Sequence, residues 1–229
     1  MDNEILIKKR YVKGLKLASI ILFGLYLLGL ANNIFIPGIE TEIVKQLFTT
    51  LMVTGVITFG AIGTSVSDKN YNLCLYFAVA MQVAFPLAFS ALFNYEYSMI
   101  NGFELFSGRM MDYAFVAAAG PMVVSILFAR FFLSIFFVIY NFVLVGFQVF
   151  SAISIPNTFI SFDNNVVATN INAINGGILG LNITYLIVVA VGVITLAWVI
   201  DSNLKEATIQ ERSNNLLGRY FSPEVRDEI

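Results

Sequence analysis

The sequence predicts an all-α fold: a polytopic membrane protein whose six transmembrane helices form a bundle, with the last helix extended into the cytoplasm. Composition is the first observation, because the 229 residues are 58% hydrophobic and only 12% charged, whereas soluble domains average about 25% charged residues. The second is a series of apolar runs of about 20 residues, the length that a helix needs to cross the hydrocarbon core. The third is the concentration of lysine and arginine in alternate connections between these runs.

Six apolar segments qualify as spans by length and hydropathy. In chain order they cover residues 17–35, 47–66, 73–93, 113–129, 131–151 and 178–200. Only Arg130 separates the fourth segment from the fifth, and together the two are far too long for a single crossing. Because a charged side chain is costly in the middle of a bilayer, we expect Arg130 in a tight turn at the membrane surface.

The basic residues predict the orientation of the bundle through the positive-inside rule. Five of them precede the first span, and with six spans eleven of the 13 fall on the same side as the N-terminus. Lys45 and Arg109 fall on the other side. We therefore predict a protein of the bacterial inner membrane with both termini in the cytoplasm. A cleaved signal peptide over residues 1–31 is the alternative for the first segment, which has a basic start and an apolar middle.

Three connections are predicted to lie outside the cytoplasm: residues 36–46, 94–112 and 152–177. The second and third are long, and loops beyond about 12–15 residues are often functional. The outer connections carry the acidic residues Glu40, Glu42, Glu96, Glu104, Asp112 and Asp163. This pattern suits a surface that receives a periplasmic ligand, or alternatively a mildly acidic surface that is merely solvated.

Few side chains inside the spans carry chemistry. The chain has no histidine, the commonest general base and metal ligand, and no ionisable residue lies at the centre of a span. This argues against a proton pump or an ion-coupled transporter. The deep polar residues are Thr54, Thr58, Gln82 and Asn141, which we interpret as interhelical hydrogen-bonding groups or alternatively as ligand contacts. We interpret the single cysteine, Cys74, as an inert buried thiol.

Proline residues are predicted to kink two of the spans. Pro86 lies within the third span, and Pro121 follows Gly120 in the fourth. Such a kink either opens a cavity for an apolar ligand or is a feature of the architecture alone.

The sixth span is predicted to continue as a cytoplasmic helix over residues 201–217, the transducer helix, because neither proline nor glycine interrupts it before Gly218. Ala197, Ile200, Leu204 and Ala207 follow the spacing of a coiled-coil seam. This narrow seam suits a weak, switchable contact in a parallel homodimer. An amphipathic tail that lies on the bilayer is the alternative.

The last fourteen residues, "LLGRYFSPEVRDEI" (216–229), resemble the segment that leads into the catalytic domain of bacterial class III adenylate/guanylate cyclases. The residues that carry the resemblance are Leu216, Leu217, Arg219, Phe221, Ser222, Pro223 and Val225. A basic N-terminus, six spans and a transducer helix also resemble the membrane-anchored members of that family. The resemblance implies four parts: a basic N-terminus (1–16), a membrane domain (17–200), the transducer helix (201–217) and the start of a missing catalytic domain (218–229).

This resemblance implies that the chain is the membrane anchor and receptor domain of an adenylate cyclase, which converts ATP to cAMP, and that it positions two catalytic domains. The family's catalytic and metal-binding motifs do not occur in the chain, so we expect no cyclisation by this chain alone and no cofactor. Mg²⁺ or Mn²⁺ is expected only in the missing domain. The expected partners are the lipid bilayer, a second copy and an unknown apolar or periplasmic ligand, but no nucleic acid. A small transporter or channel, or the sensor of another signalling enzyme, is the alternative.

Overall fold

The computed structural model describes residues 3–35, 42–101, 110–128, 130–170 and 172–220. These residues are mostly helical. The elements, in chain order, are α1 (Asn3–Phe35), α2 (Glu42–Ser65), α3 (Tyr71–Asn101), α4 (Met110–Ser125), the 3₁₀ turn η2 (Ile126–Phe128), α5 (Phe131–Ile153), β1 (Phe159–Ser161), α6 (Asn164–Thr169), β2 (Ala173–Asn175) and α7 (Gly176–Tyr220). Within the described ranges, α1, α2, α3, α5 and α7 are long and apolar enough to cross a membrane.

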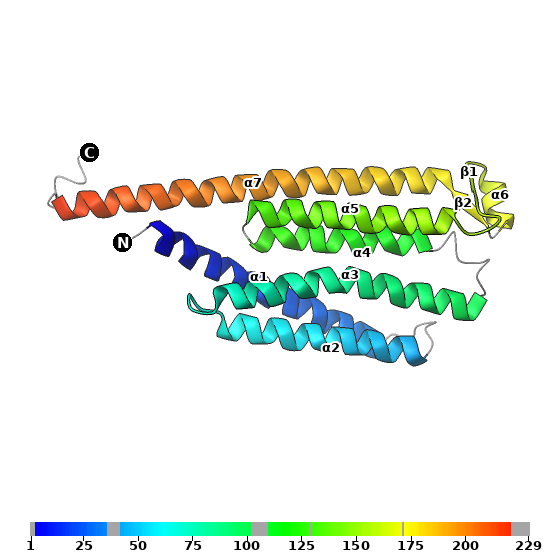
Figure 1. Ribbon diagram of the computed structural model, residues 1–229, viewed down its shortest axis with the longest axis horizontal. Coiled ribbons are helices and arrows are strands. Elements are labelled where there is room, and N and C mark those ends of the chain that lie inside the picture. Colours follow the sequence, from blue (N-terminus) through cyan, green and yellow to red (C-terminus); the bar gives the residue numbers. More distant parts are fainter. Residues whose placement is uncertain (1–2, 36–41, 102–109, 129, 171, 221–229) are drawn as a thin grey trace.

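The long helices lie side by side and form two three-helix halves (Figure 1). The first half packs α1, α2 and α3 around a core that includes Leu22, Phe59 and Ala78. The second packs α4, α5 and α7 around a core that includes Met122 and Leu186. The first core also takes in side chains of η2 and α5, so the two halves share part of their packing.

Side chains of the second half reach into the first core. Phe128 of η2 and Phe137 of α5, whose rings lie 6.2 Å apart, belong to that core. The Tyr140 hydroxyl of α5 donates a hydrogen bond of 2.8 Å to the Val83 carbonyl of α3. Val83 lies one turn before Pro86, which removes one backbone donor from α3.

The fourth predicted span, 113–129, corresponds to α4 and η2, of which Ala118–Phe128 forms an apolar helical segment too short to count with the five long ones. Arg130 has φ −125° and ψ 110° and is the N-cap of α5. This extended residue separates α5 from the preceding helical segment. The break therefore lies at the residue where the sequence predicted it.

One end of the bundle carries a small folded cap, where the sequence predicted only a loop (152–177). β1 and β2 pair in parallel, with Phe159 opposite Ala173, and α6 connects them. The Asp163 side chain caps α6 by accepting a hydrogen bond of 2.8 Å from the Asn165 backbone N–H. The all-α prediction is therefore wrong in this detail. Strands of three residues are too short to show the alternation by which a strand is recognised.

Three helices extend well beyond their predicted spans. α3 continues to Asn101, whereas the third span was predicted to end at residue 93. α1 begins at Asn3 rather than near residue 17, so most of the basic segment is helical. α7 is a single helix of 45 residues, about 68 Å long at 1.5 Å per residue, whereas a hydrocarbon core is about 30 Å thick. Its C-terminal part projects past the other helices, next to the start of α1 (Figure 1).

Candidate functional site

A polar cluster, which we name the polar clasp, connects α7 to the rest of the molecule at the end of the bundle opposite the cap. It draws side chains from α1, α3, α7 and the residue that precedes α5. Its members are Arg10, Tyr11, Tyr71, Arg130, Asp201, Lys205 and Glu211.

Arg130 lies against two aromatic rings in the clasp. Its guanidinium carbon is 4.8 Å from the centroid of the Tyr11 ring and 5.1 Å from that of the Tyr71 ring. The two rings are stacked, with centroids 6.4 Å apart and an angle of 21° between their planes. Cation–π contacts of this kind contribute about 0.5–2 kcal/mol, more where water is excluded. Tyr71 is buried, so the two aromatic rings stabilise the positive charge of Arg130 where it faces the protein interior.

On α7, the clasp is ionic. The Tyr11 hydroxyl donates a long hydrogen bond of 3.5 Å to Asp201 Oδ1, and Lys205 Nζ lies 2.6 Å from Asp201 Oδ2, one turn away on the same helix. Arg10 of α1 forms an ion pair of 3.1 Å with Glu211. Partly exposed ion pairs contribute only about 0–1 kcal/mol each. The clasp is therefore built from weak contacts that are readily reversible.

Beneath the clasp, α7 packs against α1 through the predicted dimer seam. Leu204 lines a small crevice together with Ile7 and Tyr11 of α1, and Thr208 is 1% exposed. Ala197 is buried as well and continues the inward-facing stripe of α7 that includes Val193. In this structure, the seam thus contacts the chain's own helices.

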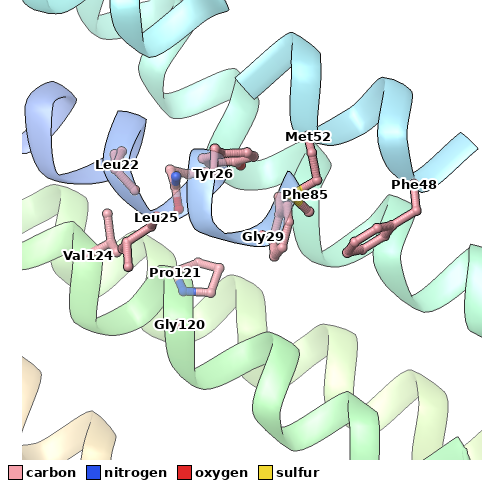
Figure 2. Close-up of a pocket in the computed structure, with 11 residues that line it drawn as sticks. Leu22, Leu25, Tyr26, Gly29, Phe48, Met52, Phe85, Gly120, Pro121 and Val124 are labelled. Carbon is pink, nitrogen blue, oxygen red and sulfur yellow. The ribbon is translucent and has the colours of Figure 1, made fainter. Parts of the chain in front are cut away.

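An apolar cavity of about 290 Å³ lies between the two halves (Figure 2). Its lining comes from four helices: Leu22, Leu25, Tyr26 and Gly29 of α1, Phe48 and Met52 of α2, Gln82 and Phe85 of α3, and Gly120, Pro121 and Val124 of α4. A side chain at Gly120 would meet no atom within 4 Å. The glycine therefore leaves part of the space open on the α4 side.

Two polar side chains line this otherwise apolar cavity. Gln82 is 3% exposed and Tyr26 is 5% exposed. Within the described part of the chain, the Tyr26 hydroxyl has no hydrogen-bond partner. The hydroxyl is itself fully buried and does not face the open space, so the amide of Gln82 is the side-chain polar group that a ligand is able to meet in the cavity.

The structure does not bring the four predicted intramembrane polar residues together. Gln82 lines the cavity, whereas Thr54 is exposed and donates to the Thr50 carbonyl of its own helix. Thr58 is partly buried on α2. Asn141 is fully buried in the other half and donates to the Phe137 carbonyl one turn earlier.

The predicted transducer residues are placed only in part. Leu204 and Ala207 are partly buried on α7. Leu216, Leu217 and Arg219 belong to the last turns of α7, where the backbone alone is described. Phe221, Ser222 and Pro223 lie outside the described residues. Cys74 is buried, as predicted.

Sequence reasoning missed Tyr11, Tyr26, Tyr71 and Asp201. The tyrosines stand in or beside apolar runs and are indistinguishable there from ordinary lipid-facing or core aromatics. A single local signal was present, the Asp201–Lys205 pair at i and i+4 on a predicted helix.

Comparisons of the chain with protein-family models, with curated proteins and with solved structures find no match.

Proposed function

We propose that this chain is the membrane domain of a class III adenylate cyclase: it anchors the enzyme, pairs with a second copy and regulates the catalytic domains through α7. The observation that carries the proposal is the continuity of α7, which runs without interruption from the cap at Gly176 to Tyr220 and is clasped to α1 on the way. The likeness of residues 216–229 to the segment that precedes the cyclase catalytic domain supplies the identity of the regulated enzyme.

The proposed topology has six crossings in the bacterial inner membrane, with both termini in the cytoplasm. α4 has 16 residues and η2 three; together they measure about 30 Å, enough to cross the hydrocarbon core. The first residues of α1, the α2–α3 connection and the last turns of α7 lie at the same end of the bundle (Figure 1). Lys69 and Arg130 lie at that end too, which agrees with the positive-inside rule.

In the proposed mechanism, the clasp governs access to α7. The stripe that contains Leu204 contacts α1 within the chain, so α7 of a second copy pairs through this stripe only after α1 has moved away. Because each clasp contact is weak, a signal that favours one arrangement by a few kcal/mol is enough to shift the populations. Release of α7 then changes how two catalytic domains meet.

A fusion experiment tests the proposal. The chain is joined after Ile229 to a known class III catalytic domain, and cAMP is measured in cells that lack their own cyclase. We expect more cAMP than the unanchored catalytic domain makes, and loss of this gain in Leu204→Pro, which breaks α7. Leu204→Met, which preserves the helix, is the matched control and should retain activity. Equal activity of the anchored and unanchored catalytic domains would contradict the proposal.

A further inference from the structure

We propose that the cavity between the two halves is a binding site for a neutral, single-chain amphiphile that enters from the membrane, with a hydroxyl or carbonyl group at the polar end. Binding in this cavity is independent of any cyclase activity, because every group that we invoke belongs to α1–α4.

The size of the cavity argues for a slender ligand. At about 290 Å³ it lies just below the range of natural ligand pockets, about 300–1,000 Å³. Apolar side chains such as Leu22, Phe48 and Val124 make up most of the lining. One aliphatic chain matches this volume and chemistry, whereas the body of a two-chain phospholipid does not.

The polar groups of the cavity argue for a neutral hydrogen-bonding group on the ligand. The amide of Gln82, in the lining of the cavity, both donates and accepts hydrogen bonds. A ligand hydroxyl or carbonyl is able to pair with it. Among the described residues that line the cavity, none is a lysine, arginine, aspartate or glutamate. Because an unpaired charge is costly in an apolar site, a carboxylate or ammonium ligand is disfavoured.

The cavity's position gives binding a structural consequence. Tyr26 and Gln82 belong to the first half, whereas Gly120 and Pro121 belong to α4 of the second. A ligand between them therefore contacts both halves at once and stabilises one relative placement.

Photoaffinity labelling of the whole chain tests the site. The protein is reconstituted in nanodiscs of phosphatidylethanolamine and phosphatidylglycerol and exposed to 1-decanol that carries a diazirine on its chain. Labelled residues are then mapped by mass spectrometry. We expect the labels on residues of the cavity. Excess 1-decanol should prevent this labelling. Decane, which lacks the hydroxyl, and decanoate, which is charged at neutral pH, should compete much less.

Three variants separate recognition from folding. Gly120→Leu fills space that is open at α4 and should abolish labelling of the cavity. Gly146→Leu makes the same change on α5, where a side chain also meets nothing within 4 Å, and should leave labelling intact. Gln82→Leu removes the amide at similar size and should weaken competition by 1-decanol roughly three- to tenfold, the effect of one lost hydrogen bond, without changing competition by decane.

Three outcomes would overturn the inference. One is labelling spread over the lipid-facing helices and insensitive to Gly120→Leu. A second is equal competition by decane and 1-decanol with no effect of Gln82→Leu. The third is a phospholipid that copurifies in the cavity and that 1-decanol fails to displace. None of these results depends on cAMP. Failure of the cyclase fusion therefore does not contradict the binding site, and failure of the labelling experiment does not contradict the proposed function.

Discussion

Tyr26 shows how closely one side chain is fitted in the first half of the bundle. Its ring lies 5.4 Å from the rings of both Phe59 and Phe85. It also covers Gly55 of α2, where a Cβ atom would overlap the Tyr26 ring. The glycine therefore permits α1 and α2 to approach closely and sets the position of a ring that lines the cavity.

This contact predicts the effect of adding a single methyl group at Gly55. Gly55→Ala should force Tyr26 out of its place and destabilise the protein by about 1–3 kcal/mol, the usual effect of overpacking a core. Gly63→Ala on the same helix is the control, because a Cβ there would lie 3.6 Å from its nearest neighbour, an ordinary contact. Thermal unfolding in detergent measures both. Equal stability of the two variants would show that the Tyr26 ring does not depend on Gly55.

At the scale of elements, the contact between α1 and α7 depends on a few charges. The Arg10–Glu211 pair is partly exposed, with side-chain exposures of 30% and 44%. Its contribution is therefore about 0–1 kcal/mol, which shifts a two-state equilibrium up to about fivefold. This pair is a suitable place to change the position of α7 without disturbing either core.

Charge reversal tests this weak link. In a Cys74→Ser background, Ile7→Cys and Leu204→Cys place two thiols in the crevice between α1 and α7, and their oxidation rate reports closure. We expect Glu211→Arg to slow disulfide formation, and the added Arg10→Glu to restore it. High salt should slow closure in the unreversed protein as well. If neither substitution changes the rate of disulfide formation, a role for the ion pair is excluded.

The limits of the helices show what the sequence was able to predict. Five predicted spans coincide with long apolar helices, because a run of about 20 apolar residues is seldom found outside membrane-spanning segments. Their ends were predicted less accurately. α1 begins near Asn3 because lysine and arginine are good helix formers, so the helix does not end where its apolar character ends. The strands β1 and β2 were not predicted, because each has only three residues and because α6 separates them in the chain.

The candidate site was predicted to a smaller extent. Gly120 and Pro121 were predicted to form a kink that either opens a cavity or is a feature of the architecture alone. Gln82 was interpreted as an interhelical hydrogen-bonding group or a ligand contact, and all three residues line the same space. The clasp was not foreseen. Tyr11 and Asp201 are 190 positions apart in the chain, and nothing in either local pattern indicates the other.

At the scale of the whole molecule, the proposed six crossings place the cap and the clasp on opposite sides of the membrane. In a Cys74→Ser background, Ser67→Cys in the α2–α3 connection and Asn157→Cys before β1 each add one thiol outside the long helices. A membrane-impermeant maleimide should label Asn157→Cys in intact spheroplasts, and Ser67→Cys only after permeabilisation. Labelling of both thiols without permeabilisation would contradict the even number of crossings.

The junction between the cap and α7 is direct. β2 ends at Asn175 and α7 begins at Gly176, and the Asn175 side chain accepts hydrogen bonds from the backbone N–H groups of Gly177 and Ile178. Close approach of Phe162 and Ile160 leaves no room for a side chain on Gly176. The strand pair is therefore joined to α7 without an intervening loop. A displacement of the strand pair moves the first turn of α7 with it.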